Sequence, residues 1–129
     1  MNVEVVWDNE EKTIIRYVFE PQWTWDQFYA AREIAREMFA AVPHKVGVIM
    51  DTPQDMLIPA KILVRGRKAL KDRPEQVAFV TFVIGNTIAR TVVNSIIRIA
   101  GEAGKNTYIA ASIEAARAVI LKKLDEIES

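Results

Sequence analysis

Polar residues gather where three predicted strands end, and their side chains could hold a small ligand. They are Asp51 and Thr52, Asn86 and Arg90, and Ser112. In an open parallel sheet, ligands bind beyond the carboxyl ends of the strands, where helix N-termini offer unpaired N–H groups to an anion. We therefore expect any small anion or nucleotide to bind at this edge. The plainer alternative is that Asn86 and Ser112 cap helices and that Asp51 orders its loop.

Other residue combinations that could support catalysis are incomplete. The single histidine, His44, precedes a strand and so lies at the opposite edge, without a second histidine as base or zinc ligand. Asp51 and Asp55 share a loop and could attract magnesium, although two acids in a polar loop are usually solvated. Residues 101–105 have the composition of a phosphate loop but follow a helix, the reverse of the required order. We therefore favour a non-enzymatic protein without metal or cofactor. The alternative is a small anion- or nucleotide-binding protein or enzyme that uses the carboxyl edge of the sheet, with Asp51 and Asn86 as polar anchors.

Three parts of the sequence carry candidate interface residues. The third predicted helix has an apolar arc wider than one sheet contact requires, including Val93 and Ile97, which suggests a homodimer. The second predicted helix has a basic face, with Lys61 and Arg65, that could meet an acidic partner. Trp25 could anchor a protein partner. The alternatives are internal packing for Trp25 and the third helix, and simple solvation for the basic face.

These residues are positioned by strands and helices that the local pattern predicts. Alternating apolar residues in segments 3–7 and 15–19 predict a β-hairpin. An amphipathic helix then begins after Thr24, whose spacing to Gln27 is that of a capping box, and ends before Pro43. Its polar side chains, which we expect to be largely solvated, are Arg32, Glu33, Arg36 and Glu37.

The rest of the chain alternates between buried strands and helices. Strands are predicted at 46–50, 77–83 and 106–111, with helices at 59–72, 86–101 and from 112 onward. We expect Pro59 to be the first residue of the second helix. The inward stripe of that helix is predicted to consist of Ile62, Leu63, Gly66, Ala69 and Leu70. Three successive crossovers require parallel neighbours, so the fold class is α/β, a mixed, mostly parallel sheet in the order β-β-α-β-α-β-α-β-α.

This order of elements over essentially the whole chain resembles the STAS domain, especially its SpoIIAA-like branch of anti-sigma factor antagonists. The resemblance rests on Trp25 at the start of the first helix, on segment 46–51 (Val-Gly-Val-Ile-Met-Asp) and on segment 110–116 (Ala-Ala-Ser-Ile-Glu-Ala-Ala). It implies a module that binds a protein partner or a small amphipathic ligand. The antagonists carry an Asp-Ser phosphorylation pair where this chain has Pro59 and Ala60, so the resemblance implies a module without that switch.

Composition limits the remaining possibilities. The chain has 129 residues, half of them hydrophobic, which suits one domain spanning residues 1–129. Lys plus Arg and Asp plus Glu both number 17, so no overall charge attracts nucleic acid, and we expect no specific nucleic-acid partner. There is no cysteine, no signal-peptide pattern and no apolar run long enough for a membrane span. We therefore expect a cytoplasmic protein.

Overall fold

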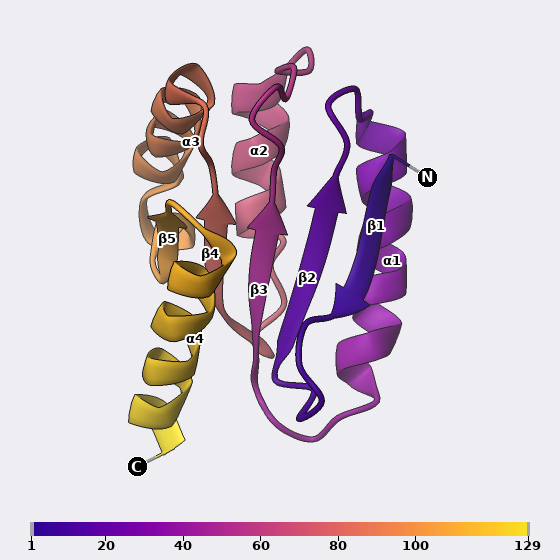
Figure 1. Ribbon diagram of the computed structural model, residues 1–129, viewed down its shortest axis with the longest axis vertical. Helices are drawn as coiled ribbons and strands as arrows, with labels where there is room; N and C mark the ends of the chain where they lie inside the picture. Colours follow the sequence, from indigo (N-terminus) through magenta and orange to yellow (C-terminus); the bar gives the residue numbers. More distant parts are fainter. Residues whose placement is uncertain (1, 129) are drawn as a thin grey trace.

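The fold is built on one five-stranded sheet. A computed structural model describes residues 2–128 of the chain. Its strands are β1 (Val3–Trp7), β2 (Ile14–Phe19), β3 (Val46–Asp51), β4 (Val77–Val83) and β5 (Thr107–Ala110). Its helices are α1 (Trp25–Ala40), α2 (Ile62–Lys71), α3 (Thr87–Ala100), the short 3₁₀ helix η1 (Gly101–Gly104) and α4 (Ile113–Glu128) (Figure 1).

The strands lie in the sheet in the order in which they occur in the chain, from β1 to β5. β1 and β2 form the antiparallel hairpin, and each later strand runs parallel to its predecessor. The predicted α/β class, the order of elements and the antiparallel edge strand are confirmed. The carboxyl ends of β2, β3, β4 and β5 consequently meet at one edge of the sheet (Figure 1).

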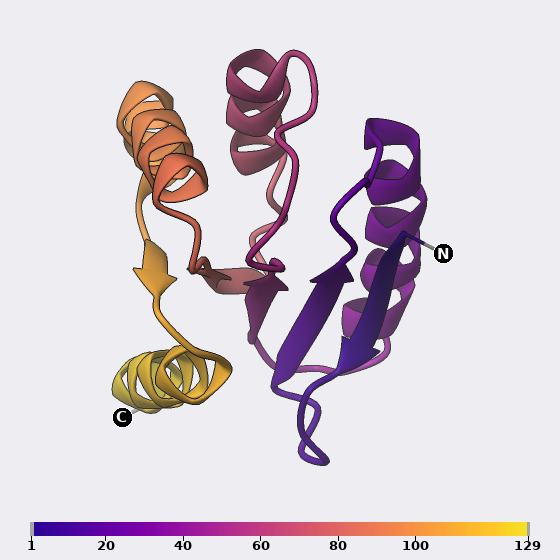
Figure 2. The same ribbon diagram turned by 45° about the horizontal axis from the view of Figure 1, so that its top comes forward.

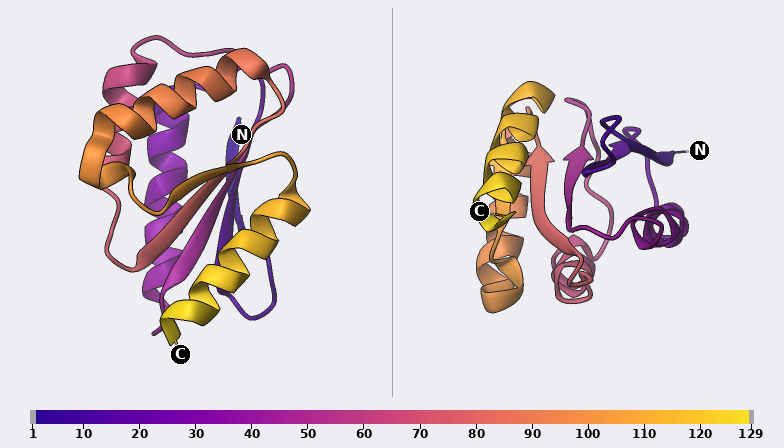
Figure 3. Two further views of the ribbon diagram at one scale, coloured as in Figure 1. Left: turned by 90° about the vertical axis from the view of Figure 1, so that its left-hand side faces the viewer. Right: turned by 90° about the horizontal axis from the view of Figure 1, so that it is seen from below.

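Helices cover the two faces of the sheet unequally. On one face, Ile15, Val48 and Val80 pack in the same cluster as the buried residues of α1. On the other face, Ile49 and Phe79 pack with α4. The strands accordingly run between α4 on one side and α1, α2 and α3 on the other (Figures 2 and 3).

The contact between β3 and α4 is close because Gly47 has no side chain. A Cβ atom at Gly47 would lie 2.2 Å from Cγ2 of Ile120, which is fully buried. Such a separation is shorter than any normal carbon–carbon contact, which is about 3.5–4.0 Å. Gly47 therefore sets how near α4 lies to the sheet.

By contrast, α2 packs mainly on α3 and η1 and makes few contacts with the strands. Gly66 allows this approach, since a Cβ atom there would lie 2.9 Å from Cδ1 of Ile96 on α3. The prediction that Leu63 faces inward is wrong: its side chain is 45% exposed. The cause is that the apolar side of α2 is turned toward α3 rather than centred on the sheet.

The helix starts follow the predicted caps in three cases out of four. Thr24 and Gln27 form the expected capping box of α1, Asn86 caps α3 and the Ser112 hydroxyl accepts the backbone N–H of Ala115. Pro59, however, is not the first residue of α2, which begins at Ile62. The reason is that Lys61 adopts φ 61°, a left-handed conformation that a right-handed helix cannot continue.

Candidate functional site

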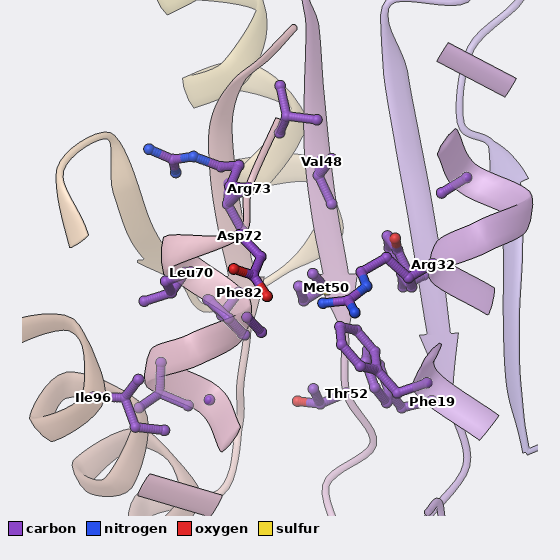
Figure 4. Close-up of a pocket in the computed structure, with 18 of the residues that line it drawn as sticks. Phe19, Arg32, Val48, Met50, Thr52, Leu70, Asp72, Arg73, Phe82 and Ile96 are labelled. Carbon is purple, nitrogen blue, oxygen red and sulfur yellow. The ribbon is translucent and has the colours of Figure 1, made fainter. Parts of the chain in front are cut away.

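A large cavity lies between α1, α2 and the sheet (Figure 4). Its volume is about 140 Å³, and part of it is open to solvent. A single water needs only about 10–15 Å³ by the same measure. We call this space the α1–α2 cavity. It exists because α2 is held on α3, away from the strands, so the space above β3 and β4 is not filled by a helix.

The wall on the α1 side is a connected group of aromatic rings. Phe19 and Trp23 meet edge to face with ring centroids 5.1 Å apart, and Trp23 meets Trp25 in the same way at 4.9 Å. Phe28 touches all three of these rings. Such edge-to-face contacts hold large side chains in defined positions. These contacts hold the four rings together as one wall of the cavity.

The remaining lining is mostly aliphatic. The residues that complete it on the sheet and on α2 and α3 include Val48, Met50, Val80, Phe82, Ile62, Ala69, Leu70, Ile96 and Ile97. An apolar lining with a few polar groups is the usual composition of a site for a small molecule.

The polar groups of the cavity come mainly from β2 and α1. Tyr17 is 5% exposed and lines the cavity from β2. Burial raises the pKa of its hydroxyl to about 12, and the nearby guanidinium groups of Arg32 and Arg36 partly oppose the rise. The phenol is therefore neutral at physiological pH and able to donate a hydrogen bond.

Arg32 and Arg36 lie one helical turn apart on α1. Arg32 reaches into the cavity from its helix (Figure 4), with its guanidinium carbon 5.0 Å from the ring centre of Tyr29. The Nε atoms of both arginines are buried and lack a hydrogen-bond partner within the described chain. Arg36 makes only a long ion pair with the exposed Glu33, at 3.8 Å.

Two further polar groups border the cavity. The Trp23 indole N–H is buried and has no partner among the residues that the structure describes. Asp72, at the end of α2, turns its carboxylate toward the space that Arg32 enters (Figure 4) and forms an exposed ion pair with Lys68 at 3.4 Å. The unpaired buried atoms of the lining are thus all hydrogen-bond donors.

The residues predicted to form a site at the strand ends are bound to other parts of the protein. The Thr52 hydroxyl donates to the Val83 carbonyl at 2.6 Å, and a guanidinium N–H of Arg90 donates to the Ile84 carbonyl at 3.2 Å. Asn86 and Ser112 cap their helices, as the plainer interpretation expects. These side chains remain near one edge of the sheet, but they do not converge on a shared cavity.

Asp51, the remaining residue of that group, belongs to a network of charges. It lies 3.5 Å from Arg16, which also contacts Asp8 at 3.3 Å. Arg117 of α4 donates to both carboxylate oxygens of Asp8, at 2.6 and 2.9 Å. Burial raises the pKa of Asp51, and Arg16 opposes the rise. This network ties the hairpin to β3 and α4.

The predicted interface residues have separate environments. Trp25 donates its indole N–H to the Ala60 carbonyl at 2.9 Å, and the Arg65 guanidinium lies 5.9 Å from its ring centre. Trp25 and Arg65 thereby join α1 to α2 beside the cavity. Lys61 is exposed, Val93 is buried and Ile97 is partly buried in the cavity lining.

Sequence reasoning missed the polar residues of the cavity. Arg32 and Arg36 were expected on a solvated face, and Tyr17 only as a strand residue. A signal that could have found them is the spacing of four between the two arginines, on the helix that also supplies Phe28 and Tyr29 to the same side.

Comparison of the chain with models of protein families, with curated proteins and with solved structures finds no match. Within residues 2–128, no helix combines the length and the apolar character needed to cross a membrane. In the same part of the chain, no group of three or more acidic or histidine side chains could hold a metal ion.

Proposed function

We propose that this chain is a non-enzymatic, STAS-like binding module that holds a small amphipathic ligand in the α1–α2 cavity. The observation that carries the proposal is the composition of that cavity. Ligand sites commonly have mostly apolar walls and a few polar groups. The α1–α2 cavity, about 140 Å³ in volume, has the same composition.

An energetic argument supports a ligand in this place. Protein interiors are close-packed, and unfilled cavity space costs about 24 cal/mol per Å³. The α1–α2 cavity leaves about 140 Å³ of such space, part of it open to solvent. An apolar molecule that fills the space recovers part of this cost and also leaves water.

The order of elements supports the STAS-like part of the proposal, because it is the order expected from the resemblance. Pro59 and Ala60 lie just before α2 and have no hydroxyl group, so the proposed module works without a phosphoserine switch. Thr52 lines the cavity, but its hydroxyl donates to the Val83 carbonyl at 2.6 Å and is therefore already engaged. This supports binding rather than catalysis.

Self-association through α3 stays a separate prediction. The large apolar side chains that α3 exposes are Ile88 and Ile99, at 70% and 50%. They lie at opposite ends of the helix, whereas Val93 and Ile97 contribute to the interior.

The test measures the binding of a neutral amphipathic probe, 1-octanol. Before the measurement the protein is unfolded in denaturant, passed over a hydrophobic resin to remove bound lipid, and refolded. Trp23 and Trp25 line the cavity, so octanol should change the tryptophan fluorescence of the wild type and raise its melting temperature. Ala69→Leu should weaken octanol binding about 60-fold, because three carbons of contact at about 0.8 kcal/mol each are taken from the ligand.

Ala115→Leu, an identical substitution at an exposed position of α4, is the matched control and should bind octanol as the wild type does. The proposal is wrong if millimolar octanol neither changes the fluorescence nor raises the melting temperature. It is also wrong if Ala69→Leu and Ala115→Leu bind octanol equally well.

A further inference from the structure

We infer that the α1–α2 cavity selects an apolar ligand that ends in an ionised carboxylate, with the carboxylate held by Arg32, Arg36 and Tyr17. The ligand class is that of medium-chain fatty acids. This inference rests on the proposed function and adds the chemistry of the ligand's polar end.

The first support is the set of donors that the protein leaves unused. A buried N–H or O–H without a partner is unfavourable, so nearly all such groups in folded proteins are satisfied. Here the Nε atoms of Arg32 and Arg36 are buried and have no hydrogen-bond partner within residues 2–128. Both arginines border one cavity, as does Tyr17, which is 5% exposed. An acceptor from outside the chain would satisfy them together.

The second support is charge. Arg32 carries a full positive charge and contacts the rings of Phe28 and Tyr29, yet no carboxylate of the described chain lies within ion-pair distance of it. Arg36 has only its 3.8 Å contact with the solvated Glu33. Arginine presents N–H groups in a planar fork that matches the two oxygens of a carboxylate. Arg32 presents such a fork in the cavity, and Arg36, whose side chain is 41% exposed, follows one turn later on the same helix.

The third support is the position of these groups relative to the apolar lining. Arg32 extends from α1 over the space between Met50 and Phe19 (Figure 4). A carboxylate bound to its guanidinium would leave the hydrocarbon chain against those apolar side chains. The neutral phenol of Tyr17, whose pKa burial raises to about 12, would then donate to the carboxylate throughout the physiological pH range.

Asp72 limits the charge of the ligand. Its carboxylate faces the same space from α2, and only the exposed ion pair with Lys68 offsets it. Its repulsion of an anion grows with the charge of the ligand, whereas one negative charge is enough to neutralise Arg32. The inference therefore names a monoanion.

The experiment compares octanoate with 1-octanol, two probes of equal chain length, at about pH 8, where a carboxyl group is fully ionised. Octanoate should bind the wild type about tenfold more tightly than octanol, since hydrogen bonds to charged groups favour the acid. Arg32→Met should remove this preference and leave octanol binding unchanged within about threefold. Arg98→Met, which removes an exposed arginine of α3, is the matched control and should keep the preference.

A second variant provides an independent test if Arg32→Met does not fold. Tyr17→Phe removes the phenol hydroxyl and should weaken octanoate binding several-fold without weakening octanol binding. Neither variant should lower the melting temperature of the ligand-free protein, whereas a purely structural role for Arg32 or Tyr17 predicts that it falls.

The outcomes separate the inference from the proposed function. If octanol binds and octanoate binds no more tightly, the inference is overturned and the proposed function stands. If the preference for octanoate persists in both Arg32→Met and Tyr17→Phe, the inference is overturned as well. If neither probe binds the wild type, the proposed function itself is overturned.

Discussion

Ala69→Leu tests whether the space under α2 is real, because the sign of its effect on stability depends on that space. Ala69 is a partly buried residue of α2 that lines the cavity. Leucine adds three carbons there, and the cavity volume of about 140 Å³ exceeds the volume that these carbons require. Alanine and leucine have similar helix propensities, so the substitution changes packing and little else.

The expected size of the effect follows from burial. Three buried carbons stabilise by about 0.8 kcal/mol each, and ordering the leucine side chain costs about 0.5–1 kcal/mol, which leaves about 1.5 kcal/mol. With an unfolding entropy of about 2.1 cal/mol/K per residue, a chain of 129 residues would melt about 5 °C higher. Urea unfolding and thermal melting of the ligand-free protein, both followed by circular dichroism, measure these quantities.

Ala31→Leu is the comparison. Ala31 is fully buried on α1 and does not line the cavity, so the added carbons would overpack the core and destabilise the protein by about 1–3 kcal/mol. If Ala69→Leu lowers the free energy of unfolding as Ala31→Leu does, α2 lies directly on the sheet and our reasoning about the cavity fails.

Two further predictions concern the opposite face of the sheet. Gly47→Ala should lower the free energy of unfolding by about 1–3 kcal/mol, measured in urea. Adding Ile120→Leu, which removes the opposing methyl group, should restore part of that free energy. If the effects of the two substitutions simply add, this account is contradicted. Burial raises the pKa of Asp51 above its usual 3.8, so its stabilising contribution is present below pH 3.8 and is lost as the pH rises through the folded-state pKa. Asp51→Asn should therefore stabilise the protein at pH 7 relative to pH 3, when each is compared with the wild type by urea unfolding, and an equal difference at both pH values would refute the assignment.

Local signals were sufficient to predict most of the framework. A capping box depends on Thr24 and Gln27 alone, and Asn86 caps its helix through a neighbour three residues away. The parallel strand order follows from the crossover rule, which needs only the sequence of elements. These features could be predicted because each is decided by residues close together in the chain.

The cavity could not be predicted in this way. The separation of α2 from the sheet depends on the contact of Gly66 with Ile96, which are 30 positions apart, and on the left-handed conformation of Lys61. An amphipathic pattern also assigns Arg32 and Arg36 to solvent, because it assumes that the neighbouring space is either core or water. A side chain can also face an internal space that is partly open to solvent. The spacing of apolar residues in the sequence does not distinguish this environment from core or water.

Because helices cover the sheet unequally, its two faces differ in how tightly they are packed. The close packing of α4 on Gly47 and the charge network around Asp8 hold the hairpin and the central strands in place. None of these contacts involves α2. Substitutions that reshape the α1–α2 cavity can therefore accumulate while the opposite face keeps the domain folded. A designer who wished to alter the cavity would vary α2 and the facing side of α1, and leave the packing of α4 on Gly47 unchanged.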